Sequence, residues 1–107
     1  MIPLACDLGA LGEEEQARRG RLTARLHASA RAIAETADGF AVRLEAETAA
    51  LEDAVGLALL ERKCCPFLRF EIVIEAARGP VWLRVGGGPE VKRFLAGTSL
   101  FGIRPPA

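Results

Sequence analysis

Two adjacent cysteines carry the clearest chemical signal in the sequence. Cys64 and Cys65 stand directly before Pro66, and Glu61 precedes them by three and four residues. Thiolates are soft ligands for metal ions, and on a helix this spacing places the Glu61 carboxylate on the same side as the thiols. That carboxylate would serve as an oxygen ligand, as a group hydrogen-bonded to a ligand, or as a proton acceptor.

A third cysteine, Cys6, lies far away in an apolar stretch over residues 2–8. If this stretch packs as an edge strand or arm beside the end of the helix that carries Cys64, three sulfurs meet. Three thiolates suit Cu(I) or Hg(II), and with one nitrogen or oxygen ligand they suit tetrahedral Zn(II). His27, the one histidine, is a weaker candidate for that fourth ligand. It lies one position off the apolar stripe of its helix, where a solvent-facing side chain is the simpler interpretation.

Other uses of the cysteines stay open. An odd count of three argues against a disulfide framework, and the lack of a C-x-x-C motif argues against a thioredoxin-like reductase. A bridge between neighbours strains the peptide, so we expect the oxidised form to join Cys6 to Cys64 or Cys65. The alternatives to a metal site are a thiol-based redox enzyme or redox-responsive protein, and a structural dimerisation module with inert, buried cysteines. An enzyme is less favoured, because no Ser-His-Asp or paired-carboxylate pattern is present.

The electrostatics of the paired thiols do not predict a reactive cysteine. A helix carboxyl terminus disfavours a thiolate, whereas the neighbouring Arg62 and Lys63 favour one. A bound metal ion would override both effects, since it deprotonates a coordinating thiol. This balance favours metal binding over unaided nucleophilic catalysis.

The spacing of apolar residues predicts two amphipathic helices that position this chemistry. The first runs from about residue 13 to 37, with an apolar stripe at Leu22, Leu26, Ala30 and Ile33. Its arginines are expected to form a solvated face. The second begins near Thr48 and ends at about Lys63 or Cys64, because Pro66 disfavours the helical conformation at Cys65. Its expected buried stripe is Leu51, Val55, Ala58 and Leu59.

Alternating apolar residues predict strands over residues 40–46, 68–76 and 81–85. The last two form a β-hairpin that turns at Arg78-Gly79. Gly86-Gly87-Gly88 then leads through Pro89 into a short helix that carries Val91, Phe94 and Leu95 and ends at Gly97. A glycine run before a helix is also a weak phosphate-binding candidate, but the spacing of a phosphate-binding loop is missing, so we interpret it as a turn.

The order helix, strand, helix, strand, strand, helix predicts an α+β fold. We expect a two-layer sandwich with a three-stranded, mainly antiparallel sheet and helices on one face. Residues 1–97 form the single domain, and residues 98–107 form an extended tail. Trp82 on the polar outer face of the sheet indicates a covering partner, so we expect a homodimer through this face or the hairpin edge.

Composition excludes several classes of partner. The 107 residues include 14 basic and 14 acidic side chains, so the net charge is zero. The sequence therefore lacks the excess of basic charge that binding to nucleic acids or anionic membranes would need. No apolar run approaches the roughly 20 residues of a membrane span, and residues 1–15 lack a basic leader. We expect a cytoplasmic protein, in a compartment that keeps thiols reduced.

The motif around the paired cysteines resembles that of a group of small bacterial proteins. Those proteins share an early A-C-x-L segment, here Ala5 to Leu8, and E-R-x-C-C-P-F-x-x-F, here Glu61 to Phe70. Similar segments occur beside, or attached to, mercury-resistance-type regulators, which implies heavy-metal handling. The resemblance covers most of the chain and implies that Cys6 belongs with Cys64 and Cys65. It implies no particular reaction.

Overall fold

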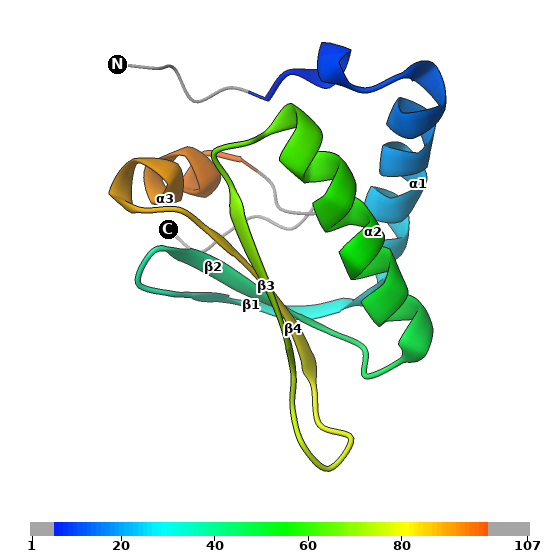
Figure 1. Ribbon diagram of the computed structural model, residues 1–107. Helices are drawn as coiled ribbons and strands as arrows, with labels where there is room; N and C mark the ends of the chain where they lie inside the picture. The colour runs from blue at the N-terminus through cyan, green and yellow to red at the C-terminus, as the bar shows by residue number, and fades with distance from the viewer. Residues whose placement is uncertain (1–5, 99–107) are drawn as a thin grey trace.

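A layer of helices packs on one face of an antiparallel sheet in the computed structural model, which describes residues 6–98 (Figure 1). A single-turn 3-10 helix, η1, opens the described chain. The elements are η1 (Leu8–Ala10), α1 (Glu13–Ser29), β1 (Ala30–Glu35), β2 (Gly39–Leu44), α2 (Thr48–Cys64), β3 (Arg69–Ile74), β4 (Val81–Gly86) and α3 (Pro89–Ala96). Among these helices, none combines the length and the apolar character that a membrane crossing needs.

The sheet has four strands in the order β1-β2-β4-β3, and every neighbouring pair is antiparallel. The α+β class and the placement of the helices on one face are therefore confirmed. The predicted three-stranded sheet and the order α-β-α-β-β-α are wrong, because a further strand, β1, stands between α1 and β2.

The missed strand is the segment predicted as the end of the first helix. The helix ends at Ser29, and Ala30 is already extended, with φ −72° and ψ 132°. Ile33 packs against the core, and β1 pairs with β2 through the turn at Asp38-Gly39. Alanine-rich residues have high helix propensity, but pairing along β2 overrides it. At the start of β2, Gly39 permits the close approach of β4, because a Cβ there would collide with the Val85 carbonyl oxygen.

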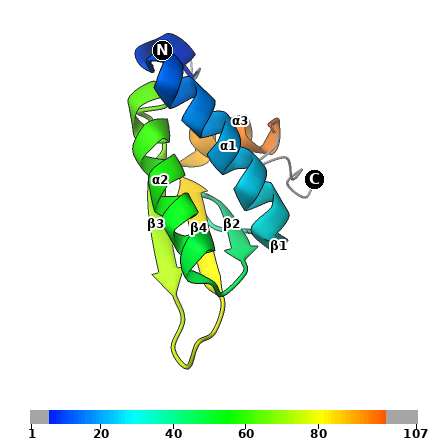
Figure 2. The ribbon, with the colours of Figure 1, turned by 90° about the vertical axis from the view of Figure 1, so that its right-hand side faces the viewer.

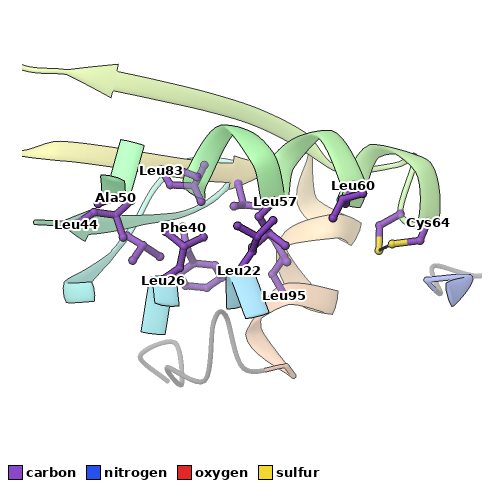
Figure 3. Close-up of a cluster of buried hydrophobic side chains, with 14 of the residues drawn as sticks. Leu22, Leu26, Phe40, Leu44, Ala50, Leu57, Leu60, Cys64, Leu83 and Leu95 are labelled. Atoms are coloured by element: carbon purple, nitrogen blue, oxygen red, sulfur yellow. Dashed lines mark hydrogen bonds between the residues drawn. The ribbon is translucent and has the colours of Figure 1, made fainter. Parts of the chain in front are cut away.

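The core lies between the inner face of the sheet and the helices. Phe40 and Leu44 of β2 and Leu83 of β4 face Leu22, Leu26 and Leu57 of the helices, as Figure 3 shows. The buried positions predicted by the alternation in residues 40–44 and 81–85 are thereby confirmed. Figure 2 shows α2 lying over β3 and β4, with α1 on the side of β1 and β2.

The buried face of α2 differs from the predicted stripe. The helix buries Ala50, Ala54, Gly56, Leu57, Leu60, Glu61 and Cys64. Val55 and Leu59, expected in the core, are 42% and 54% exposed. Gly56 explains the rotation, because it allows Arg18 and Leu22 of α1 to approach the α2 backbone closely: a Cβ on Gly56 would lie 2.9 Å from Arg18. Apolar residues on both sides of α2 leave the sequence pattern ambiguous.

The hairpin of β3 and β4 and the turn into α3 are as predicted. α3 starts at Pro89 and is capped by Gly97. Gly87 and Gly88 have φ of 155° and 114°, and a Cβ on Gly87 would lie 2.8 Å from the Phe67 carbonyl oxygen. The glycine run therefore lets the backbone at Phe67, just after the paired cysteines, pack closely against the turn into α3. The predicted tail, apart from Thr98, lies outside the described residues.

The turn between β3 and β4 contains two non-glycine residues with positive φ, which gives a test of its conformation. Ala77 and Arg78 both have φ of 57°, and Gly79 N–H donates to the Ala76 carbonyl oxygen at 3.0 Å. Left-handed residues are strained unless they are glycine or asparagine. We expect Ala77→Asn with Arg78→Gly to raise the free energy of unfolding by about 1 kcal/mol, measured by urea denaturation. Unchanged or lower stability would contradict this turn.

Candidate functional site

The paired cysteines lie where α2 ends. Cys64 is the last helical residue, and Cys65 has left the helical conformation, with φ −128° and ψ 68°, because the following proline disfavours that conformation. Cys65 N–H still donates to the Glu61 carbonyl oxygen at 2.6 Å, and Leu68 N–H donates to the Cys65 carbonyl oxygen at 3.1 Å. The predicted helix end is confirmed. Figure 3 shows Cys64 at the end of the row that Ala50, Leu57 and Leu60 form along α2.

The segment before α1 brings Cys6 to this helix end. Asp7 N–H donates to the Cys64 carbonyl oxygen at 2.7 Å. The Asp7 side chain caps η1 by accepting from Gly9 N–H at 3.0 Å, and Leu11 then enters the core. For the described residues of the stretch 2–8, the expected arm beside α2 is thus confirmed.

Cys6 is bonded to Cys65, and the two Cα atoms are 4.5 Å apart. Cys64 keeps a free thiol whose Sγ lies 3.6 Å from Cys65 Sγ. Cys64 Sγ thus lies beside the bridge, but it is not among the ligand atoms, those of Cys6, Glu61 and Cys65, that lie within 4.8 Å of one another. The structure selects Cys65, of the two candidates left open by the sequence, as the partner of Cys6 in the oxidised form.

Glu61 places its carboxylate against these sulfurs. Its Oε2 lies 3.2 Å from Cys65 Sγ and 4.0 Å from Cys64 Sγ. A bridged sulfur carries no proton, so the shorter contact becomes a hydrogen bond when Cys65 is reduced. Glu61 is 8% exposed, and the ligand atoms of Cys6, Glu61 and Cys65 all lie within 4.8 Å of one another.

The cation that balances Glu61 comes from α1. Arg19 Nε donates to Glu61 Oε1 at 2.5 Å. The expected solvated face is therefore wrong for Arg19, which lies three and seven residues before Leu22 and Leu26 and shares their side of the helix. That spacing was the one signal in the sequence that pointed to it.

Arg62 and Lys63, the cations expected to favour a thiolate, both have exposed side chains. Lys63 is exposed and pairs with Glu15 at 2.5 Å, and Arg62 is also exposed. His27 is an exposed residue near the carboxyl end of α1, whereas Arg19 and Glu15 mark the part of α1 beside the sulfurs. His27 does not belong to the group of ligand atoms that the structure brings together among residues 6–98.

Burial raises the pKa of the Cys64 thiol, and the Glu61 carboxylate raises it further, while Arg19 acts in the opposite direction. The thiol is therefore protonated at neutral pH and is a poor nucleophile. A soft metal ion reverses this, because it binds the thiolate and displaces the proton. The environment of Cys64 suits a ligand better than an unaided nucleophile.

No known protein family, curated protein or solved structure matches the chain.

The disulfide is expected to stabilise the fold, because it joins distant parts of the chain. It joins residues separated by 59 positions, and closing a loop of that length restricts the unfolded chain. We expect reduction to lower the free energy of unfolding by about 4 kcal/mol at most, measured by urea denaturation with and without reductant. Cys64→Ser should retain the difference and Cys6→Ser should abolish it. Equal stability of the oxidised and reduced wild type would contradict the bond.

Proposed function

We propose that the reduced protein binds a soft metal ion through Cys6, Cys64 and Cys65, with Glu61 beside it. The observation that supports this most is the cluster of Cys6, Cys65 and the buried Glu61 carboxylate at the end of α2, with Cys64 Sγ 3.6 Å from Cys65 Sγ. Candidate ions are Hg(II), Cu(I) and Zn(II), which prefer thiolates. The resemblance to segments found beside mercury-resistance-type regulators adds weight to Hg(II).

Loading requires the Cys6–Cys65 bond to open. Two electrons and two protons from a cellular dithiol or a small thiol convert the two sulfurs to thiols. Metal binding then displaces the thiol protons, and Arg19 offsets part of the negative charge that collects around Glu61. The oxidised chain offers one thiol and binds weakly, so the site belongs to a reducing compartment, the cytoplasm.

The role proposed for the site is sensing, buffering or delivery of the ion rather than catalysis. Cys6 is exposed, whereas Cys64 and Cys65 are buried. An exposed thiolate ligand is the one that an incoming thiol from another molecule would replace first, so the ion would enter and leave from the side of Cys6. The two buried sulfurs would retain it between these steps.

A second candidate function is a redox response, which the Cys6–Cys65 bond itself favours. A peroxide would oxidise the Cys65 thiolate to a sulfenic acid, and the Cys6 thiol would then displace water to form the disulfide. In this case Cys6 is the resolving thiol. A module with inert cysteines would show neither metal binding nor rapid oxidation.

Titration of the reduced chain against a chromophoric chelator tests the metal proposal. We expect one ion per chain, and we expect Cys6→Ser, Cys64→Ser and Cys65→Ser each to weaken binding by about tenfold or more, since each removes a thiolate ligand. His27→Ala is the matched control and should bind as the wild type does.

Two other outcomes separate the alternatives. Affinity no better than that of a short peptide with free thiols, together with fast peroxide-dependent thiol loss, would replace the metal proposal with the redox response. Weak affinity with slow thiol loss would leave the dimerisation module.

A further inference from the structure

The outer edge of β3 is the less protected of the two sheet edges. β1, at the opposite end of the strand order, has a register shift between Ala30 and Ala32, a bulge of the kind that discourages further pairing. β3 pairs with β4 without a shift over Arg69–Ile74, and it contains neither proline nor lysine. An edge of this kind is a template for another strand.

The backbone groups on this edge point outward. Glu75 N–H donates to the Pro80 carbonyl oxygen across the hairpin at 3.2 Å. Hydrogen-bonding groups alternate in direction along an antiparallel strand. The N–H and C=O groups of Phe70, Ile72 and Ile74 therefore point away from β4, and within residues 6–98 no strand pairs with them.

The helix above this edge is apolar as well. Asp53 and Lys63 of α2 pair with residues of α1. Leu51, Val55 and Ala58 recur at spacings of four and three on the side of α2 turned away from α1, which is the side of β3 in Figure 2.

Leu51 and Ala58 are half-buried, and Leu51 packs against the core, but other apolar side chains near this edge are exposed. Val55 and Leu59 of α2 and Ile74 of β3 are 42%, 54% and 63% exposed. Figure 1 shows the end of the β3–β4 hairpin extending beyond the helices. Both layers of the fold thus present apolar side chains along the same edge.

We infer that a second copy of this chain covers the edge by antiparallel pairing of the two β3 strands about a twofold axis at Ile72. The two four-stranded sheets then continue as one, and the interface uses the same surface of both copies. Phe70 lies opposite the partner's Ile74, and Ile72 lies opposite the partner's Ile72.

Charge complementarity favours a second copy as the occupant and favours this register over its two neighbours, although Arg69 also pairs with Glu71 and Asp38 of its own chain. With the axis at Ile72, Arg69 lies opposite the partner's Glu75 on the outer face, and the symmetry repeats the pair. Moving the axis by one residue places Glu71 opposite either the partner's Glu71 or the partner's Glu75, and like charges directly opposite destabilise a sheet. The edge is therefore complementary to itself. This inference does not depend on the metal proposal.

Sedimentation equilibrium of the full chain tests the interface by charge exchange. We expect a dimer whose dissociation constant rises about tenfold or more in Arg69→Glu and in Glu75→Arg, because each places like charges opposite one another twice. The double variant, R69E with E75R, should restore dimerisation. Val55→Glu, on the side of α2 that faces the β3 edge, should also weaken the dimer, whereas Ala49→Glu, at an exposed position in the first turn of α2, should not.

Amide hydrogen exchange gives an independent readout. The amides of Phe70, Ile72 and Ile74 should exchange more slowly as the protein concentration rises through the dissociation constant. A monomeric wild type, or a dimer that neither single charge variant weakens, would overturn the inference.

Discussion

The ion pair between Arg19 and Glu61 is the interaction on which the arrangement at the end of α2 depends. A carboxylate can be buried there only if a cation stands beside it, because desolvating a lone charge is very unfavourable. Arg19 supplies that cation from a helix 42 residues earlier in the sequence. The pair fixes how α1 lies against α2 and turns the second oxygen of Glu61 toward the sulfurs. The exposed pairs of the same two helices, such as Arg25 with Asp53, contribute much less.

Backbone geometry brings the three cysteines to the same end of α2. Pro66 ends the helix at the point where both cysteines can reach the same side, and the hydrogen bond from Asp7 to Cys64 brings the start of the described chain to the same place. Burial keeps the Cys64 thiol protonated, whereas reduction of the neighbouring bond would release two further thiols. The site therefore has two chemical states, one bridged and one with three thiols, and the proposed metal chemistry belongs to the second.

The sequence predicted the parts of the fold that depend on local backbone chemistry. Pro66 marked the end of α2, Pro89 and Gly97 marked the ends of α3, and alternation marked the hairpin of β3 and β4. The prediction was wrong where tertiary packing determines the structure. The residues of β1 were predicted as helix because alanine favours helix, but pairing with β2 overrides that propensity. The misplaced stripe of α2 has the same origin, since both sides of that helix are apolar and only the close approach of α1 at Gly56 selects between them. Similarly, the sequence grouped Glu61 with the paired cysteines but could not identify Arg19 among the arginines of α1.

X-ray absorption of the reduced, zinc-loaded protein shows whether all three cysteines bind one ion, because it counts the sulfur atoms bound to the metal. We expect three sulfur neighbours at about 2.3 Å and one lighter nitrogen or oxygen neighbour. Two or fewer sulfur neighbours would contradict a site built from Cys6, Cys64 and Cys65 together.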